Sequence, residues 1–281
     1  MLTAILASTK DLISSKEFPG GPALYCSQAL KYLGFDEFRV LTSKGVTYCY
    51  LRRLGVDVVG LGIGETVFNI ELSDGRTLKL ISKSFIDLTD VGNYLSNYLL
   101  ISLTMDEVPL KIIKELVRGR EVVIDVQGFV RSVDERGVVF NDYSRFWELL
   151  KLECRELVIR GEEYEFPPMC RGSKVVNCVP NDDVVLIITN GSRPIYFVSK
   201  GVLGMLEPLQ YIYGPTIGSG DVFTAVLTYE YLVRGEDLVI AIAKASTAAT
   251  LRLRGSTPWF TKDEVDLISY KVLKTYKRIV Y

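Results

Sequence analysis

Apolar positions along the chain follow two rhythms. Short and nearly continuous apolar runs, which are typical of strands buried on both faces of a sheet, occur at 98–103, 121–128, 156–161 and 184–191. Apolar residues at helical spacing occur at 22–34, 46–55, 109–119, 143–152, 221–234 and 237–253. The alternation predicts a mostly parallel sheet with helices on both faces, that is, a three-layer α/β/α fold.

The first third of the chain adds a different pattern. Strands are predicted at 2–8 and 38–43, and alternating apolar residues flank Asp74-Gly75 within 66–82, which predicts a β-hairpin. Another hairpin at the far edge of the sheet is predicted around 194–200. The chain has no internal repeat, low-complexity tract or long linker. We therefore predict a single domain over 1–281 with a small antiparallel β accessory.

Charge and composition exclude several classes of protein. With 33 basic and 34 acidic residues, the net charge of −1 gives no electrostatic reason to expect a nucleic-acid partner. No apolar run approaches the ~20 residues that span a bilayer, and residues 1–13 lack the basic start of a signal peptide. The five cysteines are odd in number and show no CxxC spacing. We therefore expect a cytoplasmic protein in a reduced compartment, with neither a disulfide framework nor a zinc site.

The chain contains no histidine, and this restricts its chemistry. Ser-His-Asp and Cys-His catalysis, histidine-bound zinc and any imidazole acid or base are excluded. Proton transfer must therefore use carboxylates, Lys, Tyr, Cys or water. The few Gln beside many Val, Ile, Leu, Lys and Glu are typical of a thermophilic source.

A glycine-rich turn at 214–220 leads directly into an apolar helical pattern, with Asp221 at the junction. One interpretation is that Asp221 only caps the helix. The other is a phosphoryl-transfer site, because glycines let a ligand approach the backbone and a helix start offers unpaired N–H groups to an anion. Asp221 would then accept the proton of an attacking hydroxyl. The pattern GxxxxGK[ST] is absent, so this is not a P-loop.

A second glycine feature changes this balance. The segment "GGPALYCSQALKYLG" (20–34) and the segment "GPTIGSGDVFTAVL" (214–227) together resemble the paired signatures of the PfkB/ribokinase family of sugar and nucleoside kinases. "DVQGFVR" (125–131) also resembles a phrase of inositol-kinase-like members. The resemblance covers nearly the whole chain and implies a ribokinase-like fold with a small β lid from about 10–18 and 64–88, which closes the site or forms a homodimer.

The resemblance also implies roles for individual residues. Asp221 would be the general base, and the N–H groups of Gly218, Ser219 and Gly220 would form the anion hole. The acceptor would contact Asp11, Gly20, Gly21, Tyr25, Gln127 and Arg131. The nucleotide would border Thr189, Asn190, Gly191 and Ala248, and Glu163 would organise Mg²⁺ through water. For Asp11 the alternative is an exposed loop acid, and for Arg131 a surface residue.

Three departures from the family pattern bear on function. Tyr25 replaces the usual Asn, which favours a cyclitol or another non-ribose acceptor. Arg160 stands where Asn is common in the family's N-x-x-E region, and the aspartate that usually precedes the second glycine block is missing, which argues against an activating monovalent cation. We predict a kinase that uses ATP and Mg²⁺ on a hydroxyl of a small sugar, cyclitol or nucleoside. The alternative is a catalytically impaired relative that acts as a small-ligand sensor or partner protein.

Overall fold

A ten-stranded sheet forms the centre of the molecule in the computed structural model, which describes residues 1–71, 77–210, 214–255 and 257–279. Its strands run in the order β16-β15-β14-β13-β12-β9-β8-β1-β4-β5. Their bounds are Leu2–Leu6 (β1), Phe38–Lys44 (β4), Asp57–Ile63 (β5), Tyr98–Ser102 (β8), Glu121–Asp125 (β9), Glu156–Glu162 (β12), Val184–Asn190 (β13), Arg193–Ser199 (β14), Val202–Leu206 (β15) and Lys277–Ile279 (β16). Seven neighbouring strands, in the order β13-β12-β9-β8-β1-β4-β5, pair in parallel. The strands β14, β15 and β16 extend the sheet beyond β13 in antiparallel pairs.

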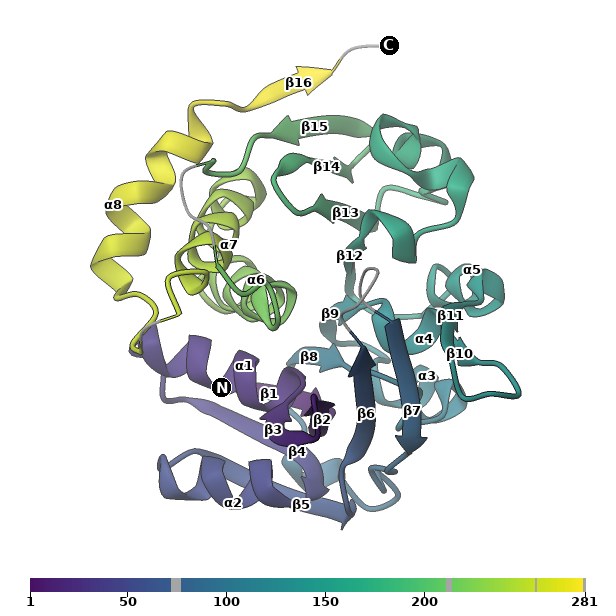
Figure 1. Ribbon diagram of the computed structural model, residues 1–281. Coiled ribbons are helices and arrows are strands. Elements are labelled where there is room, and N and C mark those ends of the chain that lie inside the picture. The colour runs from purple at the N-terminus through teal and green to yellow at the C-terminus, as the bar shows by residue number, and fades with distance from the viewer. Residues whose placement is uncertain (72–76, 211–213, 256, 280–281) are drawn as a thin grey trace.

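Helices cover both faces of this sheet (Figure 1). Their bounds are Pro22–Tyr32 (α1), Val46–Arg53 (α2), Leu110–Leu116 (α3), Gln127–Val130 (α4), Phe146–Leu149 (α5), Ser219–Thr228 (α6), Leu238–Arg252 (α7) and Lys262–Leu273 (α8). Neighbouring strand residues enter different hydrophobic cores: Leu100 packs with α1, α6 and α7, whereas Leu99 and Ile101 pack with α3 and α5. Because successive side chains of a strand point to opposite faces, one sheet separates the two cores. The predicted three-layer fold is confirmed.

The element predictions differ from the structure in three places. The helix predicted at 143–152 is a short 3₁₀ turn, Tyr143–Arg145, followed by α5. The hairpin expected around 194–200 is present as β14 and β15, but β16 pairs outside it, so the hairpin lies one strand in from the edge of the sheet. The helix predicted over 221–234 begins at Ser219 and ends in a π-helical turn, Tyr229–Val233. In each case the apolar pattern marks a regular element. The type and exact bounds of that element depend on its packing against neighbouring elements.

A small four-stranded sheet stands apart from the central one, in the order β3-β2-β6-β7 (Figure 1). Its strands are Thr9–Ile13 (β2), Lys16–Gly20 (β3), Thr66–Glu71 (β6) and Thr77–Ser82 (β7). The turn of the predicted β6–β7 hairpin, with Asp74-Gly75, lies outside the described residues. A further hairpin, Arg131–Val133 (β10) with Val139–Asn141 (β11), meets β7 through a bridge between Lys79 and Val138.

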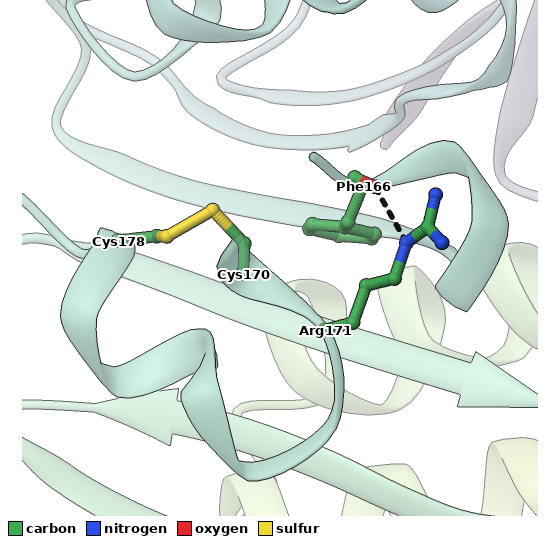
Figure 2. Close-up of a disulfide and its surroundings, with 4 residues drawn as sticks. All are labelled: Phe166, Cys170, Arg171 and Cys178. Atoms are coloured by element: carbon green, nitrogen blue, oxygen red, sulfur yellow. Dashed lines mark hydrogen bonds between the residues drawn. A yellow bond between two sulfur atoms is a disulfide. The ribbon is translucent and has the colours of Figure 1, made fainter. Parts of the chain in front are cut away.

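The expectation of no disulfide is wrong. Cys170 and Cys178 form a disulfide bond within two consecutive 3₁₀ segments, 168–170 and 172–178 (Figure 2). Arg171, next to Cys170, donates from Nε to the carbonyl of Phe166 at 3.0 Å and so fixes this loop onto the preceding segment. The pairing was missed because no motif marks it: only the path of the folded loop brings the two Cα atoms to 5.7 Å.

No helix in the described part of the chain is long and apolar enough to cross a membrane.

Candidate active site

Two adjoining cavities lie beside the carboxyl ends of the parallel strands, where ligands bind in sheets of this type. Their volumes are about 760 Å³ and about 320 Å³. The residues that line both cavities are Arg160, Glu162, Gly191, Thr216, Ser219 and Gly220. The start of α6 therefore lies at the junction of the two cavities.

Backbone geometry at the start of α6 favours an anion. Gly218 is the N-cap residue, with φ of 82°, and a Cβ built on it would lie 2.4 Å from the ring of Tyr25. Only glycine meets both conditions at this point. The N–H of Ser219 donates to the carbonyl of Thr216 at 3.1 Å, so this predicted anion-hole donor is already in use. The N–H groups of Gly220 and Asp221 have no acceptor within the described residues.

Asp221 is the third residue of α6 and does not cap it, because the N-cap is Gly218 and no side chain caps this helix end. Its carboxylate is buried, lines the larger cavity and accepts a hydrogen bond from Nε2 of Gln127 at 3.4 Å. Burial, followed by the charge of Asp125, raises the pKa of Asp221 to about 7, although Arg160 and Arg131 act in the opposite direction. A carboxyl group with such a pKa exchanges a proton readily at neutral pH.

The small sheet places Asp11 in the larger cavity. Asp11 lies on β2 and is buried, so it is not an exposed loop acid. The hydroxyl of Thr9 donates to its Oδ1 at 3.2 Å. Gly20 lies behind this carboxylate, since a Cβ there would be 2.8 Å from Asp11 Oδ2, whereas Gly21 lines the cavity itself. The predicted acceptor residues Asp11 and Gly21 thus share one wall, and Gly20 makes room for it.

The remaining predicted acceptor residues lie on the same cavity. Tyr25, Gln127 and Arg131 all line it. Arg131 is not a free surface residue, because its Nη2 pairs with Glu165 at 3.4 Å and its side chain is largely buried. The apolar residues of the lining come from the small sheet and the β10–β11 hairpin: Phe68, Leu78, Val138, Val139 and Phe140. Phe68 lies directly beside Asp11 in the pairing of β2 with β6, so the lining combines polar and apolar side chains.

The smaller cavity has an apolar wall formed by Ile195, Leu209, Phe223, Ala249 and Leu253. Of the predicted nucleotide residues, Thr189 and Gly191 line it, whereas Asn190 does not. Ala248 is fully buried in the core on α7, and its neighbour Ala249 takes the place at the cavity that Ala248 was expected to have. The same stretch of α7 therefore borders the cavity, through Ala249 and not through Ala248 itself.

The carboxylate nearest the cavity junction is not the predicted one. Glu163 lines neither cavity, and its carboxylate accepts a hydrogen bond from the amide of Asn190. Glu162 lines both cavities, and Glu165 lines the larger one, where burial raises its pKa to about 7 against the effect of Arg131. The family's N-x-x-E motif aligns with Arg160 and Glu163. The two carboxylates that line the larger cavity, also three residues apart, are instead those of Glu162 and Glu165.

The described residues contain no group of three or more acidic, Cys or His side chains that could hold a metal ion by themselves. Mg²⁺ commonly takes one or two carboxylates and completes its coordination with water and substrate phosphates. Glu162, at the junction of the cavities, has the chemistry and the position for this purpose. The role predicted for Glu163 is therefore better suited to Glu162.

Sequence reasoning gave no role to Asp125 and treated Arg160 only as a departure. Asp125 ends β9 and accepts from Arg160 Nη1 at 2.9 Å and from the hydroxyl of Thr224 at 3.0 Å. Both residues lie at or near the carboxyl ends of parallel strands. That position was the available signal, because side chains there face the ligand site of such sheets.

Comparison with known proteins gives a likeness of fold. No protein-family model matches the sequence, and no curated protein matches it significantly. A pyrophosphate-dependent kinase of the ribokinase family, solved with a pyrophosphate analogue and myo-inositol, has 18% identity and a TM-score of 0.73, covering 95% of this chain and 100% of that one. Ribokinase from Thermotoga maritima has 16% identity and a TM-score of 0.70, with 96% and 99% covered.

Phosphofructokinase-2 from Escherichia coli, solved with substrates and products, has 14% identity and a TM-score of 0.65, with 97% and 99% of the two chains covered. These likenesses extend over nearly the full length of each chain. The glycine-rich segments at 20–34 and 214–227 begin α1 and α6, which pack in the same hydrophobic core on one face of the sheet. The chain has the ribokinase fold.

Proposed function

We propose that the protein is a kinase that transfers the γ-phosphoryl group of ATP to a hydroxyl of a small sugar, cyclitol or nucleoside. The observation that carries this proposal is the position of Asp221: a buried carboxyl group with a pKa of about 7, on the first turn of a helix whose free N–H groups face the junction of two cavities. A base, an anion cradle and two adjoining binding spaces are what phosphoryl transfer requires.

The reaction follows from this arrangement. Asp11 and Gln127 orient the acceptor in the larger cavity, with one hydroxyl toward Asp221. Asp221 takes the hydroxyl proton while the oxygen forms its bond to the γ-phosphorus, and the bond from that phosphorus to the β–γ bridging oxygen breaks. ADP leaves with the electron pair, and the N–H groups of Gly220 and Asp221 stabilise the charge on the transferred group. Mg²⁺, when bound near Glu162, neutralises charge on the donor phosphates.

ATP is the preferred donor because of the smaller cavity. The apolar wall of this cavity suits a purine ring. A pyrophosphate donor has no ring and would leave the cavity empty. Pyrophosphate is the second candidate, because one of the similar structures is a pyrophosphate-dependent kinase complexed with a pyrophosphate analogue. The two donors can be separated by direct assay.

The test is product formation from a panel of sugars, inositols and nucleosides, with ATP or pyrophosphate as donor. We expect Asp221→Asn to lower kcat by about 10²-fold or more, with little change in acceptor binding, because the variant keeps the shape but loses the base. Asp237→Asn is the matched control: Asp237 also stands at a helix start, but it caps α7 and lines neither cavity. Turnover that survives in Asp221→Asn would refute the mechanism, and acceptor binding without turnover on either donor would favour a sensor.

A further inference from the structure

Arg160 lies inside the candidate active site in an unusual setting. It is on β12, only 3% exposed, and is one of two charged residues that line both cavities. The other is Glu162, which carries the opposite charge. A buried arginine therefore puts a positive charge where the two cavities meet.

The hydrogen bonds of Arg160 leave part of its guanidinium uncommitted. An arginine has five N–H donors. One on Nη1 donates to Asp125 at 2.9 Å, and two on Nη2 donate to Glu162 at 3.0 Å and Thr189 at 2.7 Å. Nε is buried and has no partner within the described residues. The three bonds hold the guanidinium rigidly and leave a second Nη1–H without an acceptor among the described residues, whereas the buried Nε has almost no surface to offer a ligand.

The end of the guanidinium that carries Nη1 and Nη2 faces the start of α6. A Cβ built on Gly220 would lie 2.8 Å from Arg160 Nη1, so no side chain separates the two groups. The ring of Phe223, one helical turn further, lies under the guanidinium at 5.3 Å. The free N–H groups at the start of α6 thus lie beside a fixed positive charge. Backbone N–H groups and a guanidinium group both donate hydrogen bonds to anions.

Charge balance keeps this arginine ionised. Burial alone would lower the pKa of Arg160, but the carboxylates of Asp125 and Glu162 outweigh burial and raise it above its usual value. The side chain therefore carries its charge throughout the working pH range without help from the ligand.

We propose that Arg160 and the first turn of α6 form a phosphate-binding site that holds a phosphoryl group without a metal ion. In the kinase proposed above, on which this role rests, the site holds the group in transit between donor and acceptor. Arg160 thereby supplies charge stabilisation that does not depend on Mg²⁺. The ligand is a phosphate group, whether free inorganic phosphate or the end of a polyphosphate donor.

The test is binding of inorganic phosphate and of pyrophosphate to the whole protein in excess EDTA, measured by isothermal titration calorimetry and by the shift in Tm. We expect both anions to bind wild-type protein, and Arg160→Lys to bind them about tenfold more weakly, because a single ammonium cannot serve Asp125 and the anion together. Arg234→Lys is the matched control, an ion-paired arginine that lines neither cavity, and it should bind as wild type does.

A second variant keeps the test decisive if Arg160→Lys folds poorly. Gly220→Ala leaves every charge in place but puts a methyl group against Nη1, and alanine is the better helix former. We expect this variant to remain folded, which far-UV circular dichroism checks, and to weaken phosphate binding by a similar factor, because the methyl group displaces the guanidinium. Anion binding that requires Mg²⁺, or that is equal in wild type and both variants, would overturn the proposal. Loss of turnover on every acceptor would refute the kinase but leave this binding test intact.

Discussion

At the scale of single residues, two aspartates in one buried region have different surroundings. Asp125 is bonded to Arg160, to Thr224 and to the backbone N–H of Gln127. Asp221 accepts a side-chain bond only from Gln127 among the described residues, at the longer distance of 3.4 Å. The well-bonded Asp125 is thus a fixed negative charge that, after burial itself, raises the pKa of Asp221. The difference lies in the partners and not in the residue type.

The pKa of Asp221 predicts how both activity and stability vary with pH. Since the base must be ionised, kcat/KM should rise with pH through about 7. The unfolded chain loses this proton near pH 3.8 and the folded chain only near 7, so the folded state binds more protons between these values. The free energy of unfolding therefore falls as pH rises through this range.

We expect Asp221→Asn, which cannot ionise, to be more stable than wild type at pH 8, with the difference shrinking toward pH 4. Urea unfolding at several pH values measures this, with Asp237→Asn as the control that should follow wild type. A stability difference between wild type and Asp221→Asn that does not change with pH would contradict the shifted pKa.

At the scale of elements, the loop from β12 to β13 is held from both ends. Arg171 bonds to the carbonyl of Phe166 and to the hydroxyl of Tyr143, and the Cys170–Cys178 disulfide closes the rest (Figure 2). This loop begins directly after Glu162 and contains Glu165, and both residues line the cavities. A disulfide in the loop therefore stabilises the segment next to the site as well as the fold.

The disulfide predicts a stability that depends on reductant. The two cysteines are separated by 8 positions, and closing a loop of this size in the unfolded chain is worth about 2–3 kcal/mol. We expect reduction, or the double change Cys170→Ser and Cys178→Ser, to lower the free energy of unfolding by about this amount in urea titrations. Cys49→Ser, which removes an exposed free cysteine, should keep the response to reductant. Equal unfolding midpoints with and without reductant would show that the bond contributes nothing.

At the scale of the whole molecule, one sheet joins two hydrophobic cores. Alternate side chains of each strand pack into one core or the other, and the sheet forms one side of both cores. If one core loses its packing, the sheet is disturbed and the other core loses its support. The two tryptophans report on different sides: Trp259 is buried in the core of α1, α6 and α7, and Trp147 packs on Phe146 of the other core, with ring centroids 5.2 Å apart.

We therefore predict that both cores unfold in a single transition. Trp147→Phe and Trp259→Phe each leave one fluorescent reporter, and the thermal transitions of the two variants should coincide with each other and with the far-UV circular dichroism of wild type, after correction for any change in stability. Two separated transitions would show that the faces of the sheet unfold independently.

The sequence by itself determined the layered α/β fold, most strands and helices, and the position of Asp221 at the start of a helix. These features follow from local rules: apolar periodicity, glycine at turns and helix ends, and the absence of histidine. The family resemblance also predicted that Asp11, Gly21, Gln127 and Arg131 contact the acceptor. The structure brings all four to one cavity, and the contact with an acceptor stays a prediction.

Only the tertiary structure decided which neighbouring residue faces the site. Glu162 lines the cavities where Glu163 was predicted, and Ala249 lines the smaller one where Ala248 was predicted. The Ser219 N–H, predicted to bind an anion, is bonded to Thr216. Such details depend on the direction in which each group points, and a shift of one residue along a strand or helix changes that direction. The Cys170–Cys178 bond and the contact of Arg160 with Gly220 join residues through the path of the chain in space. Local pattern carries no information on such contacts, because they depend on how separate elements pack together.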